Sequence, residues 1–459
     1  MVADGAGVRA GVEQEDLVEL QGSMAGAVID PGHPGYDAAR RCFNALVDRR
    51  PAVIARCTGP QDIAVALDFA RTRELEVAVR GGGHNPAGHC VCDDGLVIDL
   101  SEMRGVVVDA EARIAHAQGG STWLDFDSAT QEHGLVTPGG IVGSTGVTGL
   151  ALGGGIGHLT AQLGLTCDNI VDAELVIPDG TVIPAGPDEN AELLWGLRGG
   201  GGNFGVVTRL GLRLEPLEQV VGGRFEYRGA AVGDALRTFR DVAAHSSREL
   251  SVQAVLGVDE TVAPALLVAP SYTGADPNPE ALRTMRAARG LVSDSVGTRT
   301  FLEQQREFDS AYGENRHYWK GHFVRELTDE LIDELVARVS GSGKPAVEVL
   351  FESLHGAPKD VDPTLGGIGY RNAAFNVSVM GTWHDPVDDE SYIACVRELA
   401  TAIEPWSLGG GYVNYMQADE PLERVRAAFG ADAFERLQAL KRQYDPTNVL
   451  HRNQNIPPA

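Results

Sequence analysis

The sequence predicts an α+β fold with two unlike parts, and two observations carry this prediction. Glycine is concentrated in the first half: of 57 glycines in 459 residues, 27 fall between Gly81 and Gly205. Such a density indicates many turns and loops that approach a ligand closely, since a residue without a Cβ permits both. After about residue 220 the pattern changes to helical periodicity and alternating strand-like runs. This change predicts a second domain with an antiparallel sheet covered by helices.

Composition and motif order divide the chain into four parts. The first is acidic, rich in Gly and Ala, and expected to be a loose leader. The parts are residues 1–35 (leader), 36–218 (cofactor-binding domain of two α/β subdomains), 219–405 (substrate-binding domain) and 406–459 (C-terminal segment).

Charge and composition narrow the function classes. The net charge is -26, from 38 basic and 64 acidic residues, and such a field repels nucleic acid and anionic lipid. No run approaches the roughly 18 apolar residues of a membrane span, and no signal-peptide pattern opens the chain. Six scattered cysteines are too few for a disulfide scaffold and favour a reducing cytoplasm. We therefore expect a cytoplasmic monomer or homodimer that acts on a small molecule.

In the first half, two strand-like runs frame a glycine loop. Leu75 to Val79 precedes it and Leu96 to Leu100 follows it. Further on, Gly200 to Gly205 matches G-x-G-x-x-G, but Val206 to Leu214 alternates like a strand. A nicotinamide fingerprint requires a helix at that point, so a bulge or tight turn is the better interpretation.

In the second half, periodicity predicts helices and alternation predicts strands. The helices are expected over 234–244, 279–288, 329–339 and 434–444, and the strands over 251–258, 346–354 and 375–383.

The framed loop, Arg80-Gly81-Gly82-Gly83-His84, carries the strongest chemical signal. Backbone amides of such a loop can approach a pyrophosphate, and His84 would face the reactive end of the cofactor. The alternative is a tight turn with a surface histidine. Glycines and small hydroxyl residues at 143–149 and 153–157 suit phosphate oxygens in the same way.

A metal site is not favoured near this loop. Cys90 and Cys92 are two residues apart on an expected strand. Together with His84, His89 and Asp93 they could resemble a metal site. Neither a C-x-x-C spacing nor a second ligand pair follows, so we predict no metal.

The order of the motifs resembles the berberine-bridge-enzyme-like branch of the vanillyl-alcohol-oxidase (PCMH-type) flavoproteins, within it the 6-hydroxy-D-nicotine oxidase-like and natural-product tailoring oxidases. The likeness runs from about residue 36 to the C-terminus. The matching motifs are R-G-G-G-H at 80–84, T-G-L-x-L-G-G-G-x-G at 148–157, G-L-x-x-D-N at 164–169, L-W-x-x-R-G-G-G-G-N-F-G at 194–205, Y-V-N-Y at 412–415 and Y-D-P-T-N at 444–448, with N-Q-N-I-P-P at 453–458.

The resemblance implies FAD in an extended pose and a PCMH-type FAD-binding domain, to which the segment 406–459 returns. It implies that His84 is joined covalently to the flavin 8α-methyl. Many relatives add a second link from a cysteine eleven residues before the triple glycine, and here that position is Val142. Cys167 lies beyond the triple glycine, and we expect it to be a buried apolar residue. We therefore predict a single link.

By the same resemblance, the FAD contacts are drawn from six segments. The predicted residues are Arg80, Gly81, Gly82, Gly83, His84, Asn85, Gly88, His89, Gly143, Ser144, Thr145, Gly146, Thr148, Gly149, Gly153, Gly154, Gly155, Gly157, Asp168, Asn169, Gly205, Val206, Tyr412, Asn414, Asn453 and Asn455.

Catalysis needs a base that takes a proton while hydride leaves for the flavin. The resemblance directs attention to the substrate-domain sheet and the Tyr-x-Asn motif, where Glu352, His355, Tyr412 and Tyr415 are candidates. Glu352 and His355 face opposite sides of an ideal strand, so both reach the flavin only if a bulge intervenes. Each could instead be structural: a solvent-face acid, a turn residue or a packed aromatic.

Thr145 occupies the position that the family places near the oxygen-reacting face of the flavin, and its small size leaves room for O2. We therefore predict an oxidase that takes hydride from an alcohol or amine carbon and reduces O2 to H2O2. Two alternatives are a tailoring oxidase for a natural-product intermediate and a carbohydrate oxidase. The scarcity of tryptophan in the second domain (Trp319 and Trp383) ranks oligosaccharides below small amines and polyketide-like molecules.

Overall fold

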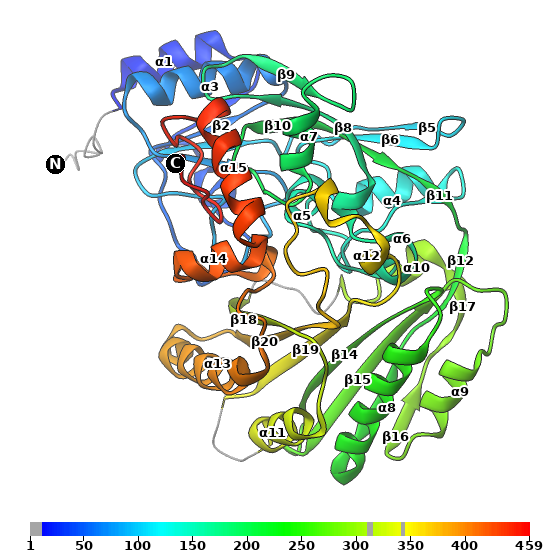
Figure 1. Ribbon diagram of the computed structural model, residues 1–459. Coiled ribbons are helices and arrows are strands. Elements are labelled where there is room, and N and C mark those ends of the chain that lie inside the picture. The colour runs from blue at the N-terminus through cyan, green and yellow to red at the C-terminus, as the bar shows by residue number, and fades with distance from the viewer. Residues whose placement is uncertain (1–11, 310–314, 341–344) are drawn as a thin grey trace.

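Three sheets of four or more strands organise the chain, two in its first part and one in its second (Figure 1). The computed structural model describes residues 12–309, 315–340 and 345–459. Within these residues no helix is both long and apolar enough to cross a membrane.

The first sheet positions the glycine loop. Its order is β1-β2-β4-β3, in which β2, β4 and β3 run parallel and β1 pairs antiparallel with β2. The bounds are β1 Ala27–Ile29, β2 Val53–Arg56, β3 Val77–Arg80 and β4 Leu96–Asp99. The loop therefore leaves the carboxyl end of the parallel strand β3, the edge at which open α/β sheets bind ligands.

The leader prediction is wrong for the described residues after 11. Helix α1 (Gln14–Ser23) packs against α3 (Pro60–Thr72), and β1 joins the first sheet. Leu20 and Met24 are buried in the same core as α3. The acidic composition suggested a loose segment, but these few apolar residues are enough to pack it against the first domain. Residues 1–11 lie outside the described residues.

The second sheet is antiparallel, with the order β5-β6-β10-β8-β9. The strands are β5 Val106–Asp109, β6 Ile114–Gln118, β8 Ile170–Val176, β9 Val182–Ala185 and β10 Val206–Arg213. Its helices are α4 Trp123–Gln131, α5 Val147–Leu152, α6 Thr160–Leu163 and α7 Ala191–Leu197. A strand does follow Gly205, so the expectation of a turn rather than a nicotinamide fingerprint is confirmed.

The third sheet has nine strands, with the path β16-β13-β15-β14-β19-β20-β18 and with β12 pairing β15 and β17. The strands are β12 Gln219–Gly222, β13 Phe225–Arg228, β14 Leu250–Val258, β15 Pro264–Tyr272, β16 Leu291–Asp294, β17 Gly297–Thr300, β18 Arg316–Val324, β19 Val347–Ser353 and β20 Phe375–Trp383. All of these pairings are antiparallel.

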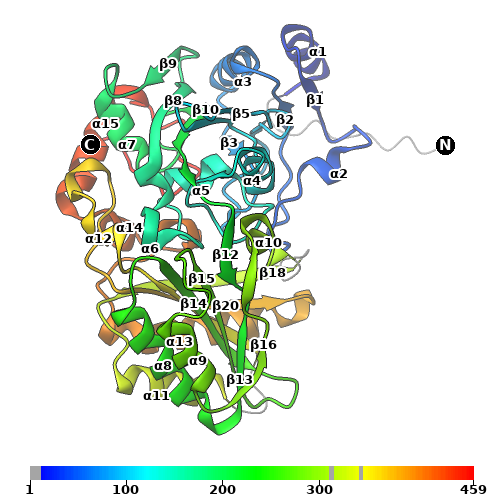
Figure 2. The ribbon, with the colours of Figure 1, turned by 90° about the vertical axis from the view of Figure 1, so that its right-hand side faces the viewer.

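Helices cover one face of this sheet, and the other face looks toward the first domain (Figure 2). The covering helices are α8 Val232–His245, α9 Glu280–Ala287, α11 Asp329–Val339 and α13 Asp389–Ile403. Along β19, Val349 and Phe351 join the helix-side core, whereas Leu350 joins a cluster with Trp319 and Met380. Because side chains alternate along a strand, Glu352 shares the face of Leu350.

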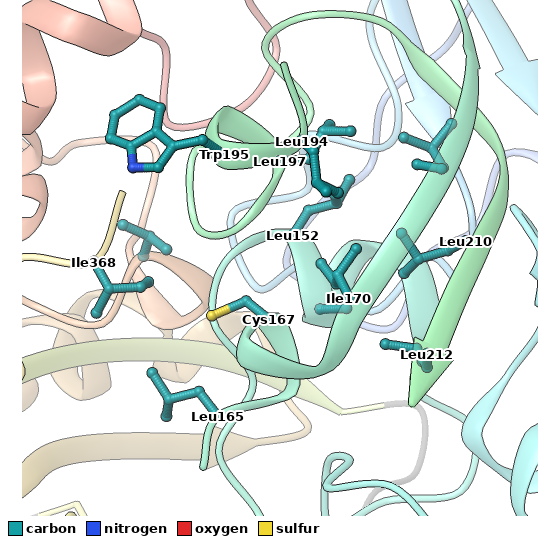
Figure 3. Packing of buried hydrophobic residues seen from close by; sticks show 14 of the residues in the cluster. Leu152, Leu165, Cys167, Ile170, Leu194, Trp195, Leu197, Leu210, Leu212 and Ile368 are labelled. Atoms are coloured by element: carbon teal, nitrogen blue, oxygen red, sulfur yellow. The ribbon is translucent and has the colours of Figure 1, made fainter. Parts of the chain in front are cut away.

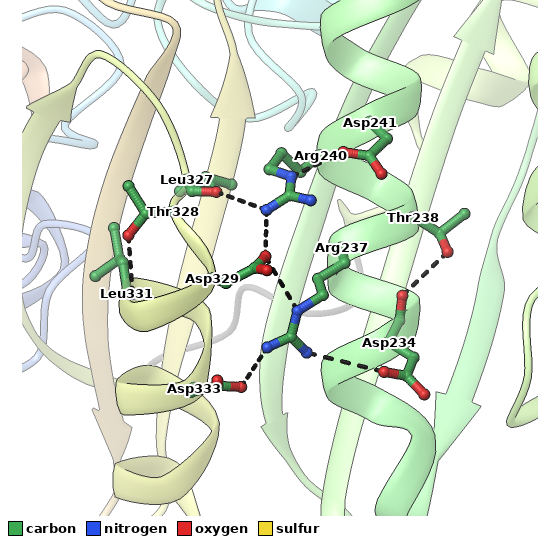
Figure 4. Close-up of polar contacts among 10 residues, drawn as sticks. All are labelled: Asp234, Arg237, Thr238, Arg240, Asp241, Leu327, Thr328, Asp329, Leu331 and Asp333. Carbon is green, nitrogen blue, oxygen red and sulfur yellow. Dashed lines mark hydrogen bonds and ion pairs between the residues drawn. The ribbon is translucent and has the colours of Figure 1, made fainter.

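Helices α8 and α11 are joined by ion pairs (Figure 4). Arg237 contacts Asp329 at 3.1 Å and Asp333 at 2.5 Å, and Arg240 contacts Asp329 at 2.6 Å. These carboxylates are exposed, so each pair contributes about 0–1 kcal/mol, and the apolar faces of the helices hold them on the sheet.

The C-terminal segment returns to the first domain, where α15 lies beside α7 (Figure 1). Helices α14 (Leu422–Phe429) and α15 (Ala431–Tyr444) belong to it. Leu437 and Leu440 of α15 share a core with Leu193 and Leu197 of α7. The domain divisions near residues 218 and 405 stay predictions.

The predicted helices and strands of the second half are present, with ends shifted by at most three residues. One local prediction is wrong: Cys90 and Cys92 lie in a turn region and not on a strand.

Candidate functional site

A cleft runs between the glycine loops of the first domain and the uncovered face of the nine-stranded sheet. It encloses about 1700 Å³, open solvent at its mouth included. Its walls come from segments 77–90, 139–156, 199–207, 412–415 and 450–454, with Trp319 contributed by β18.

Two glycine loops meet backbone to backbone at the centre of this cleft. A Cβ on Gly82 would lie 2.4 Å from the Gly146 nitrogen, and one on Gly146 would lie 2.7 Å from the Gly82 nitrogen. No side chain can therefore separate the two loops. Their main chains together form a polar cradle of the kind that suits a pyrophosphate.

Several buried polar atoms along the cleft have no hydrogen-bond partner in the protein. They are Thr148 Oγ1, Trp319 Nε1, Arg452 Nε and Nη2, and Asn453 Oδ1. An unsatisfied buried polar atom costs about 1–3 kcal/mol, so a ligand with polar groups spread along its length would relieve the cost. The glycine cradle and these polar atoms fit FAD.

His84 sits at the lip of the cradle and is held on two sides. Its Nε2 lies 2.9 Å from Ser144 Oγ. Its ring stacks on Phe43 with centroids 4.1 Å apart and planes at 18°. Burial lowers the pKa of His84 to about 4, so the imidazole is neutral at pH 7 and keeps a lone pair.

Val142 lines the cleft. Cys167 is fully buried among Leu152, Leu165 and Ile170, outside the cleft wall (Figure 3). Burial raises the pKa of its thiol well above the usual range. The expectation that Cys167 is a packed apolar residue is confirmed.

Thr145 lines the cleft between Val142 and Gly146. Its backbone is fixed on both sides: its nitrogen donates to Val142 O at 3.1 Å, and its carbonyl accepts from Trp123 N at 2.9 Å. These two bonds fix the main chain of Thr145 at the cleft wall.

Tyr412 is occupied by structural hydrogen bonds. Its hydroxyl oxygen accepts from Gly155 N at 2.9 Å and from Asn414 Nδ2 at 2.8 Å. Asn414 also donates to Leu150 O at 3.0 Å, so the motif ties the C-terminal segment to the end of α5. Burial raises the pKa of Tyr412 far above that of a free phenol, which argues against a role as base.

Glu352 and Tyr415 form the titratable pair nearest the cleft. The Tyr415 hydroxyl donates to Glu352 Oε1 at 3.2 Å, and Asn376 Nδ2 donates to Glu352 Oε2 at 2.7 Å. Burial raises the pKa of Glu352 to about 7, although both hydrogen bonds oppose this rise. Tyr415 lines the cleft, whereas the Glu352 carboxyl lies fully buried behind it.

Most predicted cofactor residues line the cleft. They are Gly81, Gly82, Gly83, His84, Asn85, His89, Thr145, Gly146, Thr148, Gly149, Gly153, Gly205, Val206, Tyr412, Asn414 and Asn453. Gly88, Gly143, Ser144, Gly154 and Gly155 belong to the same segments without forming the wall, and Gly157 and Asn455 directly follow two of them. Their contacts with FAD stay predictions.

Three predicted residues are placed elsewhere. Arg80 turns to Ala39 O, while Asp168 pairs with Arg371. Asn169 Nδ2 donates to the carbonyls of Leu163 and Leu165. These side chains support the loops and do not reach the cofactor space, so we withdraw their contacts with FAD.

His355 is not part of the site. It follows the end of β19, half-buried and away from the cleft wall. On an ideal strand His355 faces away from Glu352. The pairings of β19 contain no bulge that would bring the two side chains to the same face. We withdraw it as a candidate base.

Sequence reasoning missed Phe43, Trp319 and Asn376 as site residues. Phe43 stacks on His84, Trp319 lines the cleft, and Asn376 holds Glu352. For Asn376 a signal existed, since a polar residue interrupts the apolar run of Phe375 to Trp383. In the described residues no three His, Cys, Asp or Glu side chains gather as metal ligands would.

Comparisons with known proteins agree with this geometry. The FAD binding domain family matches residues 51–186, and the berberine and berberine-like family matches residues 411–457. The (R)-6-hydroxynicotine oxidase of Paenarthrobacter nicotinovorans is 31% identical over 457 residues, covering 95% of this chain and 97% of the relative.

Solved structures give the same picture. The 6-hydroxy-D-nicotine oxidase of Arthrobacter nicotinovorans superimposes with a TM-score of 0.88 at 29% identity, covering 95% of this chain and 99% of the other. A carbohydrate oxidase of Microdochium nivale shares the fold, with a TM-score of 0.85 at 20% identity, covering 97% of this chain and 100% of the other. The cleft thus has the architecture of FAD-dependent oxidoreductases.

Proposed function

The chain belongs to the berberine-bridge-enzyme-like FAD-linked oxidoreductases, and we propose that it is an oxidase that removes hydride from an alcohol or amine carbon of a small molecule and passes the electrons to O2, forming H2O2. The observation that carries this proposal is the Tyr415–Glu352 pair beside the cofactor cleft. When bound, FAD supplies the hydride acceptor.

We assign the cofactor contacts to the glycine loops around Gly82 and Gly146 and to polar groups such as Thr148 and Asn453. His84 is the covalent tether. Its neutral imidazole keeps a lone pair, and Ser144 occupies Nε2, which leaves Nδ1 as the attaching atom. Val142 carries no nucleophile, so one link forms.

Proton removal falls to Tyr415 and Glu352 together. Tyr415 reaches the cleft and contacts the substrate O–H or N–H, while Glu352 accepts the proton from the Tyr415 hydroxyl across 3.2 Å. A pKa of about 7 lets the carboxylate take a proton and release it again at neutral pH.

A small substrate fits the sheet face better than an oligosaccharide. Only one of the two substrate-domain tryptophans, Trp319, lines the cleft. Trp383 donates to Asp389 and stacks on Tyr392 of α13, on the helix-covered side. Of the two tryptophans on which a sugar ring could stack, only one is therefore available, which ranks amines, alcohols and natural-product intermediates first.

The test combines a spectrum with a substrate screen. The purified protein should show flavin absorbance, and an oxygen electrode with a peroxide assay should find a substrate among amines, alcohols and sugars. One mole of H2O2 should appear per mole of O2 consumed. A substrate that bleaches the flavin anaerobically without O2 uptake in air would make the protein a dehydrogenase.

We place the protein in the cytoplasm and in secondary metabolism, as a monomer or homodimer. All six cysteines are free thiols, which suits a reducing compartment. Size-exclusion chromatography with light scattering measures the oligomeric state.

A further inference from the structure

A stack of three rings connects the proposed tether to the substrate domain. Phe43 lies between His84 and His317, with centroid distances of 4.1 and 4.3 Å and interplanar angles of 18° and 13°. His84 belongs to the glycine loop of the first domain, while His317 belongs to β18 of the sheet. One phenyl ring therefore packs face to face on both.

The backbone around Phe43 is fixed to the same two partners. Its N–H donates to Gly83 O at 3.0 Å, one residue before His84. Next in the chain, Asn44 donates to Pro86 O at 2.7 Å and to His317 O at 2.8 Å, and its Oδ1 accepts from His317 N at 2.8 Å. Asn44 is buried, so these bonds are shielded from water.

The contacts restrict the imidazole of His84 in two ways. The phenyl face fixes the plane of the ring, and Ser144 Oγ, 2.9 Å from Nε2, fixes its rotation within that plane. A free side chain samples several rotamers, and freezing them before reaction removes an entropic part of the barrier. The remaining ring nitrogen then points in one direction.

We propose that Phe43 is a positioning residue for covalent attachment of FAD to His84. This inference rests on the proposed tether. Overall, attachment breaks a C–H bond of the 8α-methyl and the imidazole N–H bond and forms a C–N bond. The two protons and two electrons that are released reduce O2 to H2O2. Phe43 touches neither reacting bond; it acts through the orientation of His84.

The consequence is that the tether is seated only when both domains are assembled. His317 comes from the substrate domain and forms the outer layer of the stack, and its Nδ1 lies 3.2 Å from Thr382 Oγ1 of β20. Covalent attachment thus depends on a contact that a separately folded FAD domain would lack.

The experiment follows attachment itself and not turnover. Full-length wild type, Phe43→Leu and Phe43→Tyr are incubated with FAD in air. Flavin that survives denaturation on the polypeptide is quantified by in-gel fluorescence, relative to total bound flavin from absorbance. Phe43→Leu should attach FAD at least about tenfold more slowly at equal occupancy, since preorganised geometry is worth large factors in rate. Phe43→Tyr keeps the ring and should attach at close to the wild-type rate.

The possible outcomes distinguish the positioning role of Phe43 from the covalent tether at His84. If wild type is covalent and Phe43→Leu attaches equally fast, the positioning role is overturned and the tether stands. If Phe43→Tyr is as slow as Phe43→Leu, stacking is not the cause and the proposal fails. If all wild-type flavin is extractable, the tether and this inference fail together. Should Phe43→Leu not fold, His317→Leu loosens the outer layer of the stack and should slow attachment too.

Discussion

The Tyr415 hydroxyl donates a hydrogen bond to the Glu352 carboxylate across 3.2 Å, and the two residues lie 63 positions apart in the chain. Glu352 is on β19 of the substrate domain, and Tyr415 belongs to the C-terminal segment that returns to the FAD domain. Neither part alone contains the pair. The proposed acid–base pair forms only where the two parts come together at the cleft.

Glu352→Gln should slow anaerobic bleaching of the flavin by about 10²–10⁴-fold, the usual range for a positioned base. Burial raises the pKa of Glu352 to about 7, so the acceptor is protonated below that pH. The wild-type rate should therefore rise with pH through about 7, and this limb should vanish in Glu352→Gln. Stopped-flow traces across pH measure both effects.

Glu348→Gln is the matched control, because Glu348 lies on the same strand and face as Glu352 but its side chain is exposed. It should keep the pH limb. Tyr415→Phe should reproduce the loss seen in Glu352→Gln. If both changes leave the rate within about tenfold of wild type, the substrate relies on its own ionisation.

Tyr412→Phe should lower stability and spare the pH profile. The Tyr412 hydroxyl is the acceptor for Gly155 N–H and Asn414 Nδ2 in a buried place. Removing it leaves two donors unsatisfied, at a cost of about 1–3 kcal/mol. Urea unfolding of the holoenzyme measures the loss. A shifted pH limb in this variant would return Tyr412 to the list of candidate bases.

His84→Ala should retain FAD in an extractable form. The glycine cradle and the polar groups along the cleft are unchanged, so binding persists while the tethering nitrogen is gone. Acid precipitation should leave flavin on the wild-type pellet and release it from the variant. Flavin in the supernatant of both proteins would contradict the covalent link without affecting the fold.

Thr145→Leu should slow reoxidation by O2 and leave substrate-driven bleaching largely intact, because a larger side chain would fill space at the cleft wall. Thr145→Val preserves the size of the side chain and removes only the hydroxyl. It should reoxidise like wild type. Equal reoxidation rates for all three proteins would mean that Thr145 does not line the path of oxygen.

Local patterns predicted much of the fold but not the contacts between its parts. The strands β19 and β20 and the helix α11 follow from alternation and periodicity. The partners of Glu352 do not follow, because the hydrogen bond to Tyr415 and the register against Asn376 are set by tertiary packing. Phe43 is likewise a single aromatic residue in a polar segment, where no repeat marks it.

The C-terminal segment is held against the cleft by the buried ammonium group of Lys441. Lys441 Nζ donates to Asp445 Oδ2 at 2.7 Å, to Asn203 O at 2.9 Å and to Leu450 O at 2.9 Å. Both side chains of the ion pair are 0% exposed. The Asn203 carbonyl belongs to the loop that lines the cleft, so the lysine holds cofactor loop and C-terminus together.

Lys441→Met should therefore destabilise the protein by about 3–5 kcal/mol, since it leaves the Asp445 carboxylate buried without its counter-charge. FAD occupancy should fall as well, because loop 200–205 loses its anchor. Arg248→Met breaks an ion pair of the same length, 2.7 Å to Asp360, whose side chains are 58% and 59% exposed. Such a pair contributes about 0–1 kcal/mol, so this control should be nearly neutral. Urea unfolding of both variants, with flavin content measured beforehand, makes the comparison. Equal stability of the two variants would show that Lys441 does not secure the C-terminal segment.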